Sequence, residues 1–216
     1  NVRVAILPHI DLDSTLVQEQ ANLDAMSSQV DMNVKEVKKE TVKKQSILDA
    51  IGVSMTRIDS SKEINHLVKQ ITGHKVKCIF EVDKSAEDKR FKDWIDSQSN
   101  KKTSMVFHGT KNTSVIPILQ QGLRIRPSSN FQFSGKAYGD GNYFSDHFST
   151  SIGYTDNYGS NDKVLLIYEV HTGKESKSSF NNYSACKKAG YDSFEGGWLR
   201  VAYNENQTRI KYIIWL

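Results

Sequence analysis

Cysteine is scarce in this sequence. Only Cys78 and Cys186 occur among its 216 residues, and they are too far apart to form a CxxC pair. The pattern therefore favours neither a zinc site nor a disulfide framework. A reducing compartment is the simplest interpretation, so we expect a cytoplasmic or nuclear protein.

Long apolar runs are also missing. No stretch is apolar enough over a sufficient length to cross a bilayer, and the amino terminus has no signal-peptide pattern. The net charge is +4 and the isoelectric point is near 8.9. This mild excess of positive charge favours an anionic ligand without requiring nucleic acid. Because the chain starts with Asn1 rather than Met, we expect it to be a piece of a longer protein.

Residues 1–74 contain few glycines and no aromatic residues, and their pattern is helical. Apolar residues recur at intervals of three, four and seven, which predicts a first helix. They are Leu16, Leu23, Met26, Val30, Val34 and Val37. The charged run VKEVKKETVKK is most simply a solvated helix face, because no aromatic residues are interleaved as in a nucleic-acid patch. A second helix is predicted over residues 60–72, with Ser60 and Glu63 as a capping box.

Residues 75–216 are rich in segments typical of strands. The strongest are KVKCIFEV (75–82), SMVF (104–107), KVLLIYEV (163–170), WLRVAY (198–203) and RIKYIIWL (209–216). Short helices are predicted over residues 112–121, where Gly122 ends the pattern, and over 147–154. Residues 171–197 read as polar and irregular. Many strands with few helices between them predict an α+β domain built on antiparallel sheets.

Two segments contain candidate functional residues. In MVFHGT, a predicted strand ends on His108 and Gly109, although a histidine in this place is more often structural than functional. In GKAYGDGNYFSDHFSTSIGYT, Tyr143 begins a predicted strand, and Ser151 and Tyr154 share one helical face. A hydroxyl beside an aromatic plane suits a flat ring that carries an amide.

These segments together resemble the ADP-ribosyltransferase domain of the poly(ADP-ribose) polymerase superfamily. FHGT is followed by a helix and GL, then by YGDGNYFSDHFSTSIGY, VLLIYEVHTG and LRVAYNENQTRIKYIIWL, in the family's order. The likeness covers roughly residues 76–216 and looks closest to the mono-ADP-ribosylating members. It implies an NAD-dependent transferase with split antiparallel sheets and short flanking helices, preceded here by the helical region 1–74.

The resemblance also implies a role for each motif residue. His108 would bind the NAD ribose near the nicotinamide, and the backbone of Gly109 would bind the nicotinamide amide. Tyr143 and Tyr154 would hold the ring between them, and Ser151 would bind its amide. No metal is implied, and the transferred group would go to an acceptor side chain on a protein, including this one.

Other residues are expected around the same ligand. Thr110 completes the FHGT motif and is counted with the NAD-binding residues, and Tyr138 either lines the pocket or shapes its loop. The loop 124–137 would cover the diphosphate and adenosine, so Arg124 and Arg126 are candidate phosphate partners, with solvated loop charges as the alternative. His147 and His171 have no such support and are expected to be surface or structural residues.

The third member of the family's catalytic triad is ambiguous in this sequence. In polymer-forming members it is a glutamate, and Glu205 in YNEN is tempting. The register favours Leu199 instead, because the third residue precedes a short apolar strand, a turn ending in Gln and the last strand. We therefore predict the triad His108–Tyr143–Leu199, with Glu205 in a turn. Leucine cannot accept a hydrogen bond from a ribose hydroxyl, which predicts transfer of a single ADP-ribose.

Alternatives to this interpretation stay open. The domain could be an inactive transferase-like interaction module, an NAD glycohydrolase, or a transferase directed at nucleic acid. The helical region 1–74 could regulate access of NAD, or serve as a cap or a partner-binding element. A melting shift with NAD would separate the enzyme from the interaction module.

Overall fold

The computed structural model describes residues 46–59, 61–125, 137–156 and 162–216. The helix predicted from Leu16 to Val37 lies outside them, as do Ser60 and Arg126. In the described part of the chain, no helix is long and apolar enough to span a membrane.

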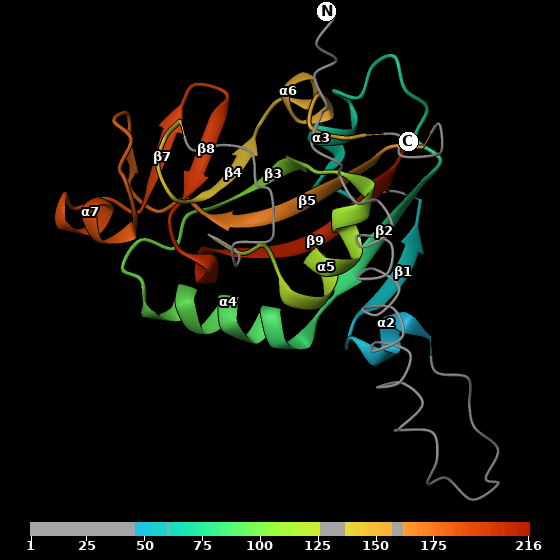
Figure 1. The fold of residues 1–216 in the computed structure, drawn as a ribbon, viewed down its shortest axis with the longest axis horizontal. Coiled ribbons are helices and arrows are strands. Elements are labelled where there is room, and N and C mark those ends of the chain that lie inside the picture. Colours follow the sequence, from blue (N-terminus) through green and yellow to red (C-terminus); the bar gives the residue numbers. More distant parts are fainter. Residues whose placement is uncertain (1–45, 60, 126–136, 157–161) are drawn as a thin grey trace, which may run out of the picture. The chain divides into compact units, whose positions relative to one another are not determined.

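Nine strands of the described residues form one sheet, in the order β1-β2-β9-β5-β3-β4-β8-β7-β6 (Figure 1). They are β1 (Ser54–Ile58), β2 (Cys78–Asp83), β3 (Thr103–Gly109), β4 (Asn142–Ser145), β5 (Val164–His171), β6 (Glu175–Ser176), β7 (Ser193–Gly196), β8 (Leu199–Ala202) and β9 (Thr208–Trp215). All pairings are antiparallel except that of β6 with β7. The predicted α+β fold is thereby confirmed.

The sheet is nearly divided between β3 and β4. β3 pairs with β5 along its whole length, from Thr103 to Gly109, but it pairs with β4 only through Phe107 and Ser145. One part is therefore β1-β2-β9-β5-β3 and the other is β4-β8-β7-β6, as expected for split sheets. His108 and Gly109 directly follow this single junction, where the two parts diverge.

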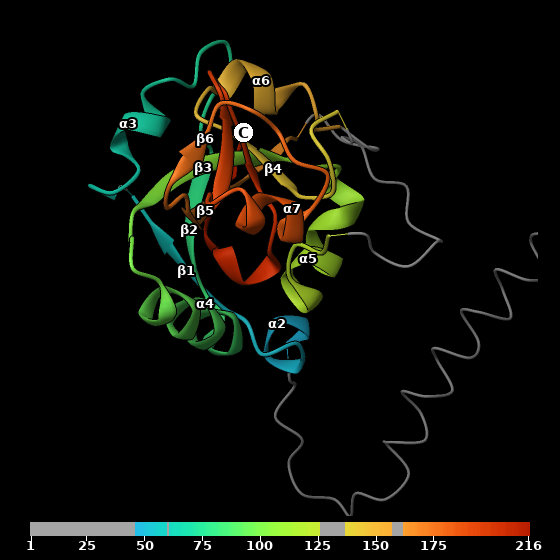
Figure 2. The same ribbon diagram turned by 90° about the vertical axis from the view of Figure 1, so that its left-hand side faces the viewer.

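Helices cover both faces of the larger part (Figures 1 and 2). α2 (Ile47–Ala50), α4 (Ser85–Ser97) and α5 (Val115–Gln121) lie on one face, and α3 (Asn65–Val68) and α6 (Phe148–Ile152) lie on the other. The remaining elements are α7 (Tyr183–Lys188) and the 3-10 turns η1 (Asn112–Ser114) and η2 (Glu205–Gln207). The predicted helix before Gly122 is confirmed as α5, and Gly122 ends it with a φ of 81°.

Three groups of buried side chains follow from this arrangement. The first core includes Val106, Leu119, Phe144, Leu166, Tyr168 and Ile213. The second core includes Leu67, Phe107, Phe148, Leu165, Ile167 and Ile214. The third core, beside α7, comprises Cys186, Phe194, Val201 and Tyr203. Each fully buried leucine or isoleucine contributes about 2 kcal/mol through the hydrophobic effect. Because β3 and β5 bury side chains in both the first and the second core, the position of β3, which carries His108, is firmly set.

The region expected to be helical before residue 75 is only partly so. Ser54–Ile58 forms β1, which pairs with β2 from Ser54 opposite Asp83 to Ile58 opposite Ile79. This stretch lies between the two predicted helices but inside the region 1–74, so the strand was not predicted, and the sheet begins before the expected boundary at 74/75. The second predicted helix is confirmed only as the short α3, which has no side-chain cap. Glu63, predicted to cap it, instead accepts a hydrogen bond from the Tyr212 hydroxyl at 2.9 Å.

The segment 171–197, expected to be irregular, contains three elements. β6, α7 and β7 lie there, and β7 pairs with β8 from Ser193 opposite Ala202 to Gly196 opposite Leu199. The two strands are set by pairing, β6 with β7 and β7 with β8, rather than by an alternating pattern of their own. Asn182 begins α7, with its side chain accepting a hydrogen bond from the backbone N–H of Ala185.

Candidate active site

The end of β3 and helix α6 approach each other without room for a side chain. A Cβ atom placed on Gly109 would lie 1.8 Å from the carbonyl oxygen of Ser151 and 3.1 Å from Cβ of Tyr154. Real Cβ atoms do not approach other atoms this closely, so only glycine fits here. The structure therefore brings together Gly109, Ser151 and Tyr154, three residues that the sequence places in one site.

His108 is tied to the neighbouring strand β4. Its Nδ1 lies 2.9 Å from the carbonyl oxygen of Tyr143, and its ring packs against Phe144 and Tyr168. A carbonyl oxygen can only accept a hydrogen bond, so Nδ1 is the nitrogen that donates. Burial lowers the pKa of His108, and the bond to Tyr143 offsets this only in part. The ring is therefore neutral at pH 7, with a lone pair on Nε2.

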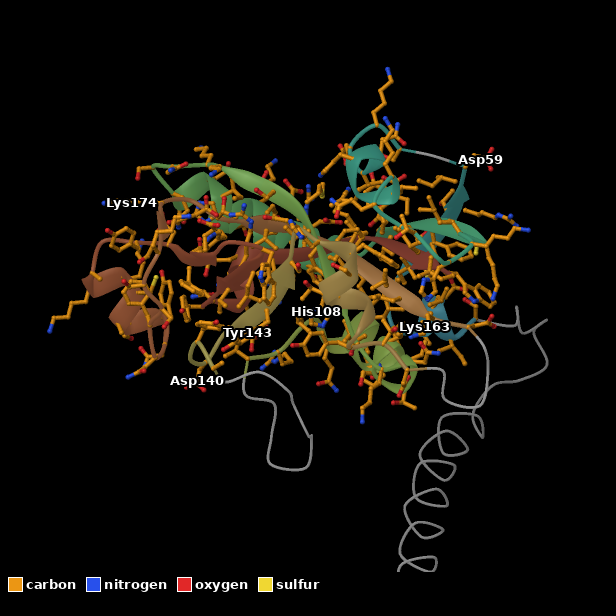
Figure 3. The ribbon with its side chains drawn as sticks, turned by 90° about the horizontal axis from the view of Figure 1, so that it is seen from above. Asp59, His108, Asp140, Tyr143, Lys163 and Lys174 are labelled. Atoms are coloured by element: carbon orange, nitrogen blue, oxygen red, sulfur yellow. The ribbon has the colours of Figure 1, made fainter. Side chains whose placement is uncertain are left out.

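Tyr143 holds the loop that precedes it. Its hydroxyl donates to the carbonyl oxygen of Gly139 at 2.7 Å and accepts from the backbone N–H of Tyr138 at 3.0 Å. Burial is the main cause of the raised pKa of Tyr143. Figure 3 shows His108 and Tyr143 close together, with Asp140 beyond Tyr143 at the edge of the molecule. Because the hydroxyl both donates and accepts a hydrogen bond, the orientation of the Tyr143 ring is fixed.

A second tyrosine, missed by the sequence analysis, supports the same loop. The hydroxyl of Tyr203 donates to the carbonyl oxygen of Tyr138 at 2.9 Å and accepts from the N–H of Phe180, also at 2.9 Å. Burial raises the pKa of Tyr203 to about 12. Tyr138 itself stacks on Phe194, with ring centroids 4.9 Å apart. Of the two roles expected for Tyr138, these contacts favour shaping the loop.

Gly139 lets this loop meet the segment before α7. Its φ is 89°, and a Cβ there would lie 1.9 Å from the carbonyl oxygen of Phe180. The next residue, Asp140, donates its N–H to the carbonyl oxygen of Asn181 at 2.7 Å. A residue with a side chain would break this contact, which explains one glycine of the YGDG motif.

Ser151 and Tyr154 differ in exposure although they are one turn apart. Ser151 is buried within α6, whereas Tyr154 follows the helix and is 57% exposed. The predicted helix over 147–154 is confirmed as α6, which is shorter. Beyond it, Asp156 accepts a hydrogen bond from the N–H of Asn112 at 2.8 Å, which ties the segment after Tyr154 to the one after Thr110. Thr110 is partly buried beside Gly109.

Leu199 and Glu205 occupy different surroundings. Leu199 begins β8 opposite Ser145, and Val201 lies opposite Tyr143. The short strand expected after Leu199 is therefore confirmed, while Glu205 lies beyond it in η2. The carboxylate of Glu205 accepts a hydrogen bond from the N–H of Ile125 at 2.7 Å and pairs with Nε of Arg124 at 3.4 Å. The structure thus places Arg124 next to a carboxylate.

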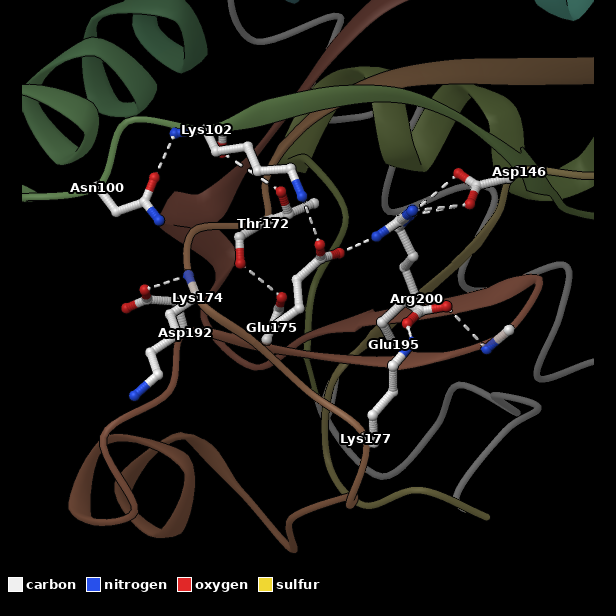
Figure 4. Close-up of polar contacts among 12 residues, drawn as sticks. Asn100, Lys102, Asp146, Thr172, Lys174, Glu175, Lys177, Asp192, Glu195 and Arg200 are labelled. Carbon is white, nitrogen blue, oxygen red and sulfur yellow. Dashed lines mark hydrogen bonds and ion pairs between the residues drawn. The ribbon is translucent and has the colours of Figure 1, made fainter.

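An ionic network fixes β8 beside the site (Figure 4). Nε of Arg200 donates to both carboxylate oxygens of Asp146 at 3.0 Å, and its Nη1 pairs with Glu175. Lys102 also pairs with Glu175, at 2.6 Å. The network joins β8 to β6, β3 and the end of β4. No sequence motif indicated it, because its members are far apart in the chain.

The other histidines considered are not at this site. His147 is exposed and precedes α6, whereas His171 is fully buried and accepts a hydrogen bond at Nδ1 from the indole of Trp94 at 3.0 Å. They are surface and structural residues, as predicted. The described residues contain no group of three or more His, Cys, Asp or Glu side chains that could hold a metal ion.

Comparisons with known proteins agree with the geometry of the site. The family model of the poly(ADP-ribose) polymerase catalytic domain matches residues 55–197. The match begins in β1 and includes His108, Tyr143 and Ser151, but it ends before Leu199 and Glu205. β1 therefore belongs to the matched region, although the expected boundary at 74/75 had placed it in the preceding region.

Individual relatives extend this result. The chain is 42% identical over 173 residues to the putative poly [ADP-ribose] polymerase-like protein 100L of Invertebrate iridescent virus 6, covering 72% of this chain and 94% of that protein. It is 35% identical over 124 residues to poly [ADP-ribose] polymerase 2 of Arabidopsis thaliana, covering 56% of this chain but only 19% of the plant protein. A stretch of 34 residues is 59% identical to the uncharacterized protein 101L of the same virus.

Proposed function

The chain belongs to the family of poly(ADP-ribose) polymerase catalytic domains, and we propose that this domain transfers one ADP-ribose from NAD to a protein side chain. As a member of the family it is an NAD-dependent ADP-ribosyltransferase. The observation that carries the NAD-binding part of the proposal is the contact of Gly109 with Ser151, which brings the end of the FHGT strand and the SxxY helix together.

Nicotinamide is the part of NAD that would bind beside this contact. The amide would bind the backbone of Gly109 and the hydroxyl of Ser151. Tyr143, whose hydroxyl is held by Tyr138 and Gly139, offers a fixed ring as one wall. Tyr154 is exposed and available as the other wall. A planar ring between two phenol rings gains stacking energy of about 1 kcal/mol per pair.

His108 would orient the ribose. With Nδ1 donating to Tyr143, the neutral ring presents Nε2 as an acceptor for a ribose hydroxyl. Cleavage of the bond between nicotinamide and ribose leaves the electron pair on nicotinamide and builds positive charge on the sugar. The acceptor side chain then attacks the sugar carbon and loses its proton. The protein residues named here lower the barrier by positioning, because none of them needs to be the nucleophile.

Transfer of a single unit, rather than a polymer, is supported by Leu199 and Glu205. Chain growth needs a group that accepts a hydrogen bond from the ribose hydroxyl of the acceptor, and a leucine side chain cannot do this. Glu205, the nearby alternative in the sequence, has its carboxylate engaged by Ile125 and Arg124. Its position beyond β8 also supports the assignment of Leu199 as the third residue.

The test is incubation with labelled NAD, followed by gel separation and mass-spectrometric mapping of the modified side chain. We expect one discrete modified band in wild type and in Glu205→Gln, and no band in His108→Ala. A ladder of polymer would contradict single transfer, and so would loss of the band in Glu205→Gln as complete as in His108→Ala. Free ADP-ribose without a modified protein would indicate a glycohydrolase. A melting temperature that does not change with millimolar NAD would indicate an interaction module.

A further inference from the structure

Glu205 contacts a segment that is distant in the sequence. Its side chain, which is 24% exposed, reaches from the start of η2 to the residues after α5. One carboxylate oxygen accepts a hydrogen bond from the N–H of Ile125 at 2.7 Å, and the other lies 3.4 Å from Nε of Arg124. Glu205 therefore fixes both the backbone and a side chain of this segment.

The same segment is also attached to β4. The side-chain amide of Asn142 donates to the carbonyl oxygen of Leu123 at 3.0 Å. Asn142 is buried and directly precedes Tyr143, the ring proposed to stack on nicotinamide. Leu123 to Ile125 is thus held from β4 on one side and from η2 on the other, so Arg124 lies beside the strand that carries Tyr143.

The way in which Glu205 holds Arg124 leaves part of the guanidinium available. The contact is made through Nε, and the described residues give Arg124 no other ion pair or hydrogen bond. The two terminal nitrogens, which form the fork that binds an anion in bidentate fashion, are not used by Glu205. The Arg124 side chain is 54% exposed, so an anionic ligand can reach them.

We infer that Glu205 is a positioning residue, which orients Arg124 toward the diphosphate of NAD. The inference rests on the proposed function, because it assumes that NAD occupies the site. It gives Glu205 a role without making it the third residue of the triad. The carboxylate holds the guanidinium through Nε, and the terminal nitrogens bind the phosphate oxygens.

The test compares ligands that contain the diphosphate with one that does not. Calorimetry would measure binding of NAD, ADP-ribose and nicotinamide to wild type and to Glu205→Gln. The glutamine amide oxygen can still accept from Ile125, but the ion pair is lost. Since a partly exposed pair contributes little, we expect NAD and ADP-ribose to bind about fivefold more weakly and nicotinamide to bind unchanged. Asp96→Asn, which removes the exposed ion pair of Asp96 on α4 with Lys101, should change the binding of none of the three ligands.

Arg124→Gln tests the other member of the pair and, as the Arg124 side chain is exposed, should not disturb the fold. It should weaken the binding of NAD and of ADP-ribose at least as much as Glu205→Gln does. The double variant should bind both ligands no more weakly than Arg124→Gln alone. Unchanged or tighter NAD binding in Glu205→Gln would overturn the inference, as would additive losses in the double variant. Failure of wild type to bind NAD would instead overturn the proposed function, and with it this inference.

Discussion

Gly109 and Ser151 are in contact through their backbones, although 42 positions separate them in the chain. A Cβ on Gly109 would lie 1.8 Å from the carbonyl oxygen of Ser151. The sequence motif led us to expect a glycine so that the ligand could approach the backbone. The structure gives a second reason, because the packing of α6 on the end of β3 itself requires the glycine.

Gly109→Ala should therefore damage both fold and binding. The added methyl group must push α6 away from β3, and overpacking of this kind costs about 1–3 kcal/mol of unfolding free energy. NAD binding should be lost, since Ser151 and Tyr154 move with the helix. Denaturant unfolding and calorimetry would measure the two effects.

Gly153→Ala is the matched control for that substitution. Its Cβ would meet only the carbonyl oxygen of Thr150 at 3.5 Å, an ordinary contact, and its φ is −66°. It should change neither stability nor NAD binding appreciably. Equal behaviour of the two variants would contradict the packing argument.

Tyr203→Phe should weaken NAD binding from outside the pocket. The ring stays in the third core, but the N–H of Phe180 and the carbonyl oxygen of Tyr138 lose their partner. Two unpaired polar groups cost about 1–3 kcal/mol of unfolding free energy. Because Tyr138 in turn donates to the hydroxyl of Tyr143, the Tyr143 ring loses its fixed orientation.

Urea unfolding and NAD titration of Tyr203→Phe, Tyr143→Phe and the double variant would test this coupling. The effects on NAD binding should not add, since both hydroxyls hold one loop. Tyr191→Phe is the control, because no hydrogen bond of its hydroxyl occurs among the described residues and its ring also packs on the third core. Strictly additive losses would show that the two tyrosines act independently.

The strands of the central sheet were predictable because their own side chains alternate or form apolar runs. β2, β3, β5 and β9 each bury residues on one or both faces, and this appears directly in the sequence. β1 was missed because it buries no residue fully and its conformation is set by pairing with β2. β6 and β7 are likewise short and are set by strand pairing, β6 with β7 in parallel and β7 with β8 in a tight hairpin.

The same distinction applies to the site. His108, Gly109, Tyr143 and Ser151 lie in two continuous motifs, so their types and spacing could be read together. Tyr203 and Arg200 could not be found in this way, because they act through contacts with residues 54 to 65 positions away. A tyrosine at the end of an apolar strand and an arginine within it carry no local signal of such contacts.

Arg200→Met should weaken the attachment of β8, which begins at Leu199, to β6 and to the end of β4. Asp146 loses three close contacts with the guanidinium, and Glu175 keeps only Lys102 in this network. Hydrogen bonds to charged groups are worth about 1.5–3 kcal/mol each, so we expect the unfolding free energy to fall by about 2 kcal/mol. Lys177→Met, which removes the exposed partner of Glu195, should cost far less in the same denaturation experiment. Equal losses would show that the Arg200 network is no more stabilising than a surface pair.

His108 should make the stability of the domain depend on pH. Burial holds the pKa of His108 below its ordinary value of about 6.5. At a pH between the folded and the unfolded pKa, the unfolded chain binds more protons than the folded one. Stability therefore decreases as the pH falls through about 6.5, by at most about 1.4 kcal/mol per pH unit, and the loss ends once the pH is below the folded pKa.

Unfolding by urea at pH 7.5 and at pH 5.5 would measure this loss, with His108→Gln as the comparison. Glutamine can still donate to the carbonyl oxygen of Tyr143 but does not titrate, so the variant should lose less stability than wild type between the two pH values. Transfer activity of wild type should stay level below pH 6.5 until the imidazole is protonated, because protonation removes the Nε2 lone pair. A transfer rate that already halves near pH 6.5, or equal loss of stability in wild type and His108→Gln, would contradict a neutral His108.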